Sequence, residues 1–261
     1  MDYFKQTIAW LTDLIFPARC IGCNKFGHAY SPRYSYGEAG RQAGDGHNQN
    51  WLCKSCRAKI KIASTSACIG CNQSSPRGDT CLSCCRENAI DRIIAAGNYA
   101  DPILRNLITT LKYRFVPSLA EQCLVLIERP LRDMHQSKGV NIFENNPVIV
   151  PVPLHPYRFN WRGFNQAELI GHLVANTYQV HILNALSRNR RTDPQANIDD
   201  PIERAQNIAD AFHCPDPSLV SEHDIILVDD VCTSGATLNA CAKVLKSSGA
   251  RKITALVVAR G

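Results

Sequence analysis

Two adjacent carboxylates, Asp229 and Asp230, follow an apolar segment of the chain, residues 225–228. The length and branching of that segment are typical of a strand buried on both faces of a parallel sheet. Open α/β folds bind ligands beyond the carboxyl ends of such strands, where these two side chains are expected. Neighbouring carboxylates can accept hydrogen bonds from two adjacent hydroxyl groups, which indicates a sugar. The alternative is that the two acids only cap the following helix.

A loop of small and hydroxyl-bearing residues comes next and opens a helix. Little side-chain bulk shields its backbone N–H groups, so a monophosphate can approach them closely. The loop has no lysine of the nucleotide-cradling kind, and the glycines of the dinucleotide pattern are missing. The predicted phosphate-binding residues are Thr233, Ser234, Gly235, Ala236 and Thr237. Strand, acids and loop in this order predict a sugar-phosphate site.

This run of residues resembles the phosphoribosyl-pyrophosphate (PRPP) motif of type I phosphoribosyltransferases. The resemblance implies that Asp229 and Asp230 hold the ribose hydroxyls, with a role in catalysis, and that residues 233–237 hold the 5-phosphate. The following helix places Leu238, Cys241, Ala242 and Leu245 on one face and leads into a strand over residues 253–259, which completes a βαβ unit.

Two basic segments are candidates for the pyrophosphate side of such a site. Residues 151–166 follow another expected strand and carry Arg158 and Arg162, whose guanidinium forks suit phosphate oxygens. The alternative is a surface loop in which these arginines stack on aromatic neighbours. Lys112 closes an expected helix, where a cation also favours the negative end of the helix dipole. We expect residues 151–166 to be a loop along the same edge of the sheet as Asp229.

A long polar stretch lies between the expected strand at residues 181–186 and the motif strand. It is too long for an ordinary connection and indicates a lid, with Gln195 and Arg204 as the residues that reach the ligand. A lid would exclude water from a reaction that builds oxocarbenium character. A disordered loop is the alternative.

Nine of the 13 cysteines lie before residue 86; eight of them form four Cys-x-x-Cys turns, and Cys85 is left over. Two such turns complete a tetrahedral structural zinc site, and disulfides are the alternative in an oxidising compartment. Interleaved pairing stays open, as do Cys85 in place of Cys84 and a ligand role for His28 or His47. Sequential pairing predicts one site from Cys20, Cys23, Cys53 and Cys56 and another from Cys68, Cys71, Cys81 and Cys84.

The cysteines also change the meaning of the formal charge of +6. Two tetrathiolate zinc sites of charge −2 each reduce it to about +2, which weakens the case for a generally basic nucleic-acid-binding protein. A local patch of Arg57, Lys59 and Lys61 beside Trp51 could still contact single-stranded nucleic acid. The alternative is a solvated face.

The chain divides into three parts at this level. Residues 1–19 read as an amphipathic helix, residues 20–90 as a small double zinc-ribbon domain, and residues 91–261 as an α/β domain with a doubly wound, mostly parallel sheet. No segment is long and apolar enough to span a membrane, and no signal peptide is evident.

Taken together, these blocks resemble the competence protein ComF family. The resemblance rests on the four Cys-x-x-Cys turns, residues 111–113, 150–156, 162–166 and 192–195, Arg204, Asn207 and the Asp229-Asp230 motif. It implies a zinc-binding amino-terminal module and a type I phosphoribosyltransferase domain that binds magnesium-PRPP. It also implies a cytoplasmic role in natural transformation, on or near incoming single-stranded DNA and with competence proteins as partners.

Two classes of function remain open. As an enzyme, the protein would transfer ribose-5-phosphate from magnesium-PRPP to an acceptor that the motif does not encode. As a binding module, the same pocket would sense PRPP or a related ligand, while the zinc ribbons contact DNA or competence proteins. We favour the role in DNA uptake and leave turnover open.

Overall fold

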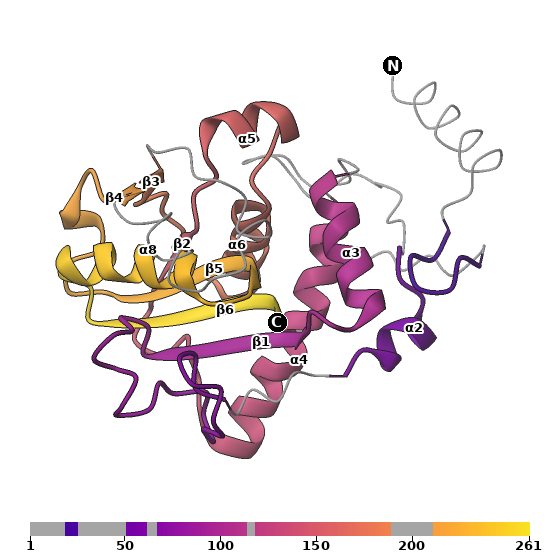
Figure 1. Cartoon of the computed structure of the whole chain (residues 1–261), viewed down its shortest axis with the longest axis horizontal. Coiled ribbons are helices and arrows are strands. Elements are labelled where there is room, and N and C mark those ends of the chain that lie inside the picture. Colours follow the sequence, from indigo (N-terminus) through magenta and orange to yellow (C-terminus); the bar gives the residue numbers. More distant parts are fainter. Residues whose placement is uncertain (1–18, 26–50, 62–66, 114–117, 189–210) are drawn as a thin grey trace. The chain divides into compact units, whose positions relative to one another are not determined.

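The structure is a computed structural model of the chain, and it describes residues 19–25, 51–61, 67–113, 118–188 and 211–261 (Figure 1). The chain divides into two compact units, residues 1–60 and 61–261. The expected amphipathic helix and the lid residues Gln195 and Arg204 lie outside the described residues.

The smaller unit contains the helix α2 (Lys54–Lys59) among its described residues. Cys53 is its N-cap, with Sγ accepting a hydrogen bond from the amide of Cys56 at 3.3 Å. The Ile21 amide donates to the carbonyl of Trp51 at 2.8 Å, which joins the first cysteine turn to the segment before α2. The local fold of this unit is therefore organised around its cysteines.

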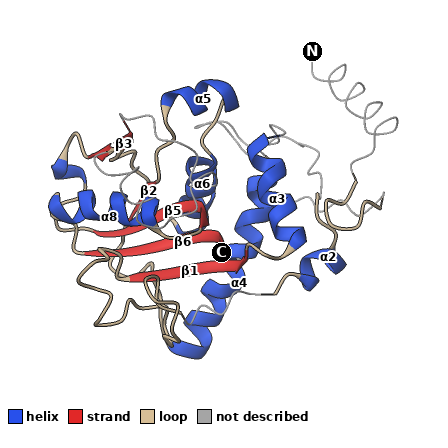
Figure 2. Ribbon diagram, in the orientation of Figure 1, coloured by secondary structure: helices blue, strands red, loops and turns tan. Residues whose placement is uncertain are grey.

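A parallel sheet forms the centre of the larger unit, with strand order β1–β6–β5–β2 (Figure 2). Its strands are β1 (Arg92–Asn98), β2 (Val148–Pro151), β5 (Asp224–Cys232) and β6 (Lys252–Arg260). Residues 253–259 of β6 are all buried, as expected for a strand covered on both faces. The doubly wound α/β fold predicted from the sequence is confirmed.

Four helices build the layers around this sheet: α3 (Pro102–Tyr113), α4 (Leu119–Lys138), α6 (Gln166–Tyr178) and α8 (Ala236–Ser247). α4 and α6 pack on each other and on one face of the sheet, and α8 lies on the other face (Figure 1). The buried side of α8 is formed by Leu238, Cys241, Ala242 and Leu245, as the periodicity predicts. None of the described helices combines the length and the hydropathy needed to cross a membrane.

The basic segment after β2 differs from the expected loop, because it contains the helix α5 (Pro156–Arg162). Nδ1 of His155 accepts a hydrogen bond from the amide of Tyr157 at 3.1 Å and caps the helix, with Pro156 in its first turn. Gly163 ends the helix at φ 74°, a left-handed conformation that glycine adopts without strain. The segment therefore presents its arginines from a helix.

Two other expectations about strands are corrected. The expected strand at 181–186 is reduced to a single parallel bridge between Ile149 and Ile182. The chain then forms β3 (Ser187–Arg188), which pairs antiparallel with β4 (Phe212–His213), and a 3-10 turn follows at η2 (Pro217–Leu219). β5 is longer than expected, because its pairing with β6 continues to Cys232, well past the end of β2.

Candidate functional site

A cavity of about 290 Å³ lies where β5 extends beyond β2. Its walls come from the end of α3, the segment after β2, α5, the start of α6, β3, β5 and the start of α8. The structure gathers there most of the described residues predicted to bind the sugar, the phosphate and the pyrophosphate. Those that line the cavity are Lys112, Arg158, Arg162, Asp229, Asp230, Thr233 and Thr237.

The two carboxylates lie within β5 instead of following it. Val228 is the last residue of β5 that pairs with β2, so Asp229 and Asp230 pass the end of that neighbour. Successive side chains of a strand point to opposite faces of a sheet. The cavity reaches both faces because β2 has ended at this point and no longer covers the edge of β5. The carboxylates can therefore approach one ligand from two directions.

Asp230 is held by an ion pair with Lys112, the penultimate residue of α3. The Lys112 Nζ to Asp230 Oδ1 distance is 2.7 Å, and the two side chains are 21% and 10% exposed. Burial alone would lower the pKa of Lys112, but the charge of Asp230, its hydrogen bond and the charge of Asp229 together outweigh burial and raise that pKa. Lys112 therefore stays charged beside the carboxyl of Asp230.

Asp229 has a different electrostatic environment. Burial, reinforced by the neighbouring charge of Asp230, raises the pKa of Asp229 to about 7. Its Oδ1 accepts a hydrogen bond from the amide of Asp230 at 2.8 Å. Asp229 therefore exchanges a proton near neutral pH beside the Lys112–Asp230 ion pair, a property that suits acid–base chemistry.

The predicted phosphate loop turns directly from β5 into α8. Gly235 is the N-cap residue of α8 at φ 78°, and Ser234 Oγ accepts a hydrogen bond from the amide of Ala236 at 3.4 Å. The first amides of a helix lack intrahelical acceptors and attract anions. Thr233 and Thr237 line the cavity on either side of this turn, while residues 234–236 form the turn itself.

Part of the cavity wall is cationic. Arg162 is 9% exposed, and its Nη1 donates to Oε1 of Gln166 at 2.9 Å. Its guanidinium lies 5.1 Å from the ring centroid of Tyr113, which restricts its orientation further. Within the described part of the chain, neither Arg162 Nε nor Gln166 Nε2 has a hydrogen-bond partner. Both atoms are buried donors in side chains that line the cavity.

Arg188 completes this wall, although the sequence analysis did not single it out as a ligand. It is 9% exposed on β3, and its guanidinium lies 5.2 Å from the ring centroid of Phe212. Burial and the charge of Arg158 lower its pKa, so the fold brings two arginines together here at an energetic cost. The basic run that starts at Arg188 is the feature of the sequence that could have indicated its role. No comparable feature of the sequence indicates Gln166 as a partner of Arg162.

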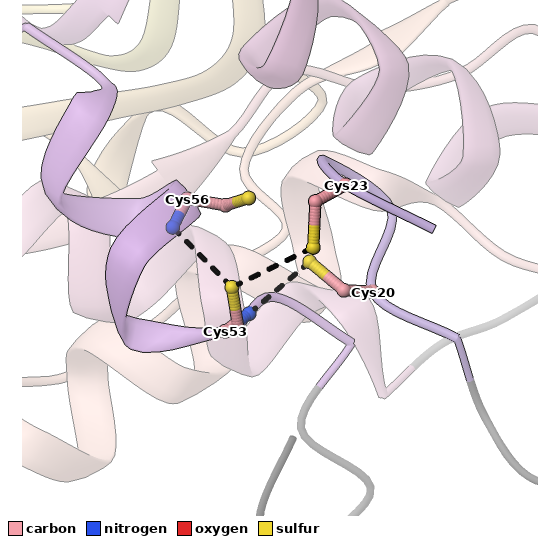
Figure 3. A group of neighbouring side chains, drawn as sticks. All are labelled: Cys20, Cys23, Cys53 and Cys56. Carbon is pink, nitrogen blue, oxygen red and sulfur yellow. Dashed lines mark hydrogen bonds between the residues drawn. The ribbon is translucent and has the colours of Figure 1, made fainter. Parts of the chain in front are cut away.

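The first cysteine cluster gathers four sulfurs that turn toward one another (Figure 3). All lie within 4.8 Å of one another, and Sγ of Cys23 and Cys53 are 4.0 Å apart. Four sulfurs at about 2.3 Å from one zinc ion would be separated by about 3.8 Å. The donor set and its spacing therefore fit zinc. The cluster consists of Cys20, Cys23, Cys53 and Cys56.

The second cluster, in the larger unit, has the same construction. Cys71 and Cys81 are 3.8 Å apart at Sγ, and Cys84 is the fourth member. Cys85 instead points its thiol at the carbonyl of Leu82, at 3.1 Å. The cluster consists of Cys68, Cys71, Cys81 and Cys84, so both clusters follow sequential pairing.

The two clusters share a repeat that the sequence analysis overlooked. Cys-Ile-Gly-Cys-Asn occurs at residues 20–24 and again at 68–72. In both copies the asparagine adopts a left-handed conformation, φ 58° at Asn24 and 57° at Asn72. Its amide donates to the carbonyl of the first cysteine, at 2.8 and 3.1 Å respectively. The repeat is a sequence signature of one turn used twice.

Backbone amides prepare one thiolate in each cluster. The Cys53 amide points at Sγ of Cys20, and the Cys81 amide at Sγ of Cys68, each at 3.4 Å. Burial opposes ionisation of these thiols, but the hydrogen bonds outweigh it and lower the pKa of Cys20 and of Cys68 to about 6. Each cluster therefore offers a preformed anionic ligand to a metal ion.

Comparison with known proteins agrees with this architecture. The phosphoribosyl transferase domain family matches residues 126–261. Competence protein F of Haemophilus influenzae is 28% identical over 81% of this chain and 97% of its own length. DNA utilization protein YhgH of Escherichia coli K12 is 25% identical, covering 77% and 93%. Competence protein ComFC of Bacillus subtilis is 24% identical, covering 76% and 79%.

The solved structure of the allosteric regulatory enzyme of purine biosynthesis is 18% identical. The match covers 53% of this chain and 25% of that enzyme, with a TM-score of 0.32. The fold and the cavity define a type I phosphoribosyltransferase domain joined to cysteine clusters. The chain belongs to the phosphoribosyl transferase domain family, as a homologue of competence protein F, ComFC and YhgH.

Proposed function

We propose that the cavity at the end of β5 binds PRPP, or a closely related 5-phosphorylated ribose, together with magnesium. The observation that carries this proposal is the convergence of Asp229, Asp230 and the residue 233–237 turn on one cavity. Asp230 would accept hydrogen bonds from the ribose hydroxyls, and the first amides of α8 would hold the 5-phosphate.

The pyrophosphate would lie against the cationic wall. Arg162 and Arg188 are buried donors on that wall, and Arg158 lies beside them in the cavity lining. Guanidinium groups bind phosphate oxygens through paired hydrogen bonds, which fixes the direction of the pyrophosphate as well as its charge. Magnesium would enter with the ligand, bound to its phosphate oxygens. Gln195 and Arg204, outside the described residues, are proposed to close over it.

We propose that each cysteine cluster holds one zinc ion in a structural role. Four thiolates leave no open position for a substrate, which distinguishes such sites from catalytic zinc sites. Metal binding would supply folding free energy to the surrounding turns, on the order of ten kcal/mol per site.

The biological setting that we propose is natural transformation, in the cytoplasm and on or near incoming single-stranded DNA. Support comes from relatives that are similar over most of their length, competence protein F and DNA utilization protein YhgH. Competence proteins are accordingly the proposed partners.

An alternative function is catalytic transfer of ribose-5-phosphate to an acceptor. A nucleophilic atom of the acceptor would form a bond to C1 of the ribose as the bond from C1 to pyrophosphate breaks, with the electron pair leaving on the pyrophosphate. The acceptor proton would pass to Asp229. The observation that favours this alternative is the pKa of about 7 at that carboxyl, which matches a general base near neutral pH.

Calorimetric titration of the full chain with magnesium-PRPP tests the proposed site. Asp230→Asn and Thr233→Ala should each weaken binding about tenfold or more, because each removes a hydrogen bond to a charged partner. Asp224→Asn, at the opposite end of β5, is the matched control and should bind as the wild type does. Equal affinity for all four proteins would refute the site.

A pyrophosphate-release assay, with and without single-stranded DNA, then distinguishes the two functions. Binding without release supports the binding module. Release that requires an added acceptor supports the transferase.

A further inference from the structure

The second cysteine cluster is built directly against the phosphate loop. Ile69 lies between two of its ligands, Cys68 and Cys71, and is 6% exposed within the same hydrophobic core as Cys232 and Leu238. A Cβ placed on Gly235 would lie 3.3 and 3.4 Å from the Cγ1 and Cδ1 atoms of Ile69. The side chain of Ile69 therefore rests on the backbone of the turn that opens α8.

A half-buried arginine makes a second connection between the same two elements. Arg260, the last residue of β6, donates from Nη1 to the carbonyl of Ala67 at 2.9 Å and from Nη2 to the carbonyl of Cys68 at 2.7 Å. Arg260 also pairs with Cys232 in the sheet, and the amide of Gly261 donates to the carbonyl of Cys232 at 2.9 Å. The first turn of the cluster is thus fixed to the strand end that precedes the phosphate loop.

A third connection comes from the other end of the cluster. Asn239, in the first turn of α8, accepts a hydrogen bond from the amide of Ala89 at 2.8 Å and donates to the carbonyl of Glu87 at 3.0 Å. The amide of Glu87 in turn donates a hydrogen bond to the carbonyl of Cys84 at 3.2 Å, which connects Asn239 to the cluster. Both halves of the second cluster therefore contact the phosphate loop or the helix behind it.

We propose that zinc in the second cluster positions the phosphate loop, so that metal binding and ribose-phosphate binding strengthen each other. Ile69, Asn239 and Arg260 are the positioning residues that transmit this effect, and none of them lines the cavity. The proposal rests on the proposed function of the cavity. A tetrahedral metal centre fixes the two cysteine turns relative to each other, and the turns fix the amides that face the phosphate.

The coupling has a required symmetry. If zinc raises the affinity for the ribose ligand by some factor, the ribose ligand raises the affinity for zinc by the same factor, and couplings of about 5- to 150-fold are typical between protein sites. The first cluster belongs to the other compact unit and supplies the internal comparison, since both clusters use the same Cys-Ile-Gly-Cys-Asn turn. Cys23 and Cys71 occupy equivalent, exposed positions in the two copies.

The first experiment compares Cys71→Ser with Cys23→Ser in the full chain. Zinc content by mass spectrometry should fall by one ion in each variant. Hydrogen exchange, measured without ligand, should show faster exchange in residues 232–240 for Cys71→Ser only, and magnesium-PRPP should bind that variant about tenfold more weakly. Loss of one zinc ion with unchanged exchange and unchanged affinity would overturn the proposal.

Failure of this inference is distinguishable from failure of the proposed function. Faster exchange in residues 232–240 without any PRPP binding, even to the wild type, would preserve the structural coupling and refute the ligand. Normal PRPP binding by Cys71→Ser, with unaltered exchange, would preserve the proposed ligand and refute the structural coupling.

A second set of variants keeps the metal ligands intact. Ile69→Ala should retain two zinc ions and lose about tenfold in PRPP affinity. Leu82→Ala, also in the second cluster but 89% exposed, is the control and should lose neither. Should Ile69→Ala fail to fold, the wild type gives the reciprocal measurement: saturating PRPP should slow zinc release to a chelator from one of two sites. Cys23→Ser identifies that site as the second. Zinc-release rates that do not change with PRPP would contradict the coupling.

Discussion

Lys112 and Asp230 form an ion pair of 2.7 Å that joins the end of α3 to β5 inside the candidate ligand cavity. The sequence predicts that Lys112 faces the pyrophosphate. In the structure Lys112 also pairs with Asp230. A carboxylate with 10% of its side chain exposed would be costly without a cation next to it. The pair therefore places a cation beside the carboxylate that the ribose hydroxyls would contact.

Replacing the lysine should destabilise the fold. Lys112→Met leaves a buried charge unpaired, and we expect a loss of about 3 kcal/mol in the free energy of unfolding, the lower end of the range for buried pairs because Lys112 keeps some exposure. Urea denaturation measures this loss. Adding Asp230→Asn to the same chain should restore most of it, since the double variant has no unpaired charge. A single variant as stable as the wild type would show that solvent, and not the pair, supports Asp230.

The carboxyl of Asp229 should make stability depend on pH in an unusual direction. Its pKa is about 7 in the folded chain against an ordinary value of 3.8, so between about pH 4 and pH 7 the folded chain holds a proton that the unfolded chain has released. Stability from this group is therefore lost as the pH rises through that window. In urea denaturation at several pH values, Asp229→Asn should flatten the decline. Asp224→Asn, whose carboxylate pairs with Arg251 at the other end of β5, should leave the slope unchanged.

Binding should follow the opposite trend. Ribose hydroxyls donate hydrogen bonds more readily to the ionised carboxylate of Asp229 than to its protonated form. PRPP affinity should therefore rise as the pH increases through about 7. Calorimetry at constant ionic strength checks this, with Asp229→Asn as the variant that lacks the dependence. An identical pH profile for variant and wild type would assign the titration to another group or to the ligand phosphates.

The parts of the fold that follow from local pattern were predictable from the sequence. The buried face of α8 follows from apolar spacing, and the position of Asp229 follows from the apolar residues 225–228 that precede it within β5. The two cysteine clusters follow from turn spacing, because each Cys-x-x-Cys turn fixes two ligands within a few residues.

Other features depended on contacts that leave no local pattern. α5 has no apolar periodicity, and its N-cap is a histidine where a serine or aspartate would have been recognised. The bonds from Arg260 end on backbone carbonyls, which every residue possesses, so no partner residue could indicate them. The extension of β5 past β2 was decided by the length of the neighbouring strand β6. These are tertiary effects, and they shaped the cavity.

The cationic wall should discriminate pyrophosphate from a simple phosphate. Arg162→Lys keeps the charge but loses the planar fork that donates to Gln166 and to a ligand. We expect magnesium-PRPP affinity to fall about tenfold, the loss of one charge-assisted hydrogen bond of about 1.5 kcal/mol, with ribose-5-phosphate affinity unchanged. Arg251→Lys, at the opposite end of β5, is the control. Equal losses for both ligands would move Arg162 out of the pyrophosphate side.

Two glycines offer a test of how closely the second cysteine cluster supports the phosphate loop. Gly235 and Gly163 have nearly equal backbone angles, φ 78° and 74°, but a Cβ would contact Ile69 at 3.3 Å in the first case and nothing within 4 Å in the second. Alanine costs about 1–2 kcal/mol at either position from the left-handed backbone alone. Gly235→Ala should therefore be more destabilising than Gly163→Ala in urea denaturation, by the cost of displacing Ile69. Combining Gly235→Ala with Ile69→Val should reduce that excess, because a shorter side chain leaves room for the new methyl group. If the two alanine variants lose equal stability, the loop yields freely and Ile69 does not set its position.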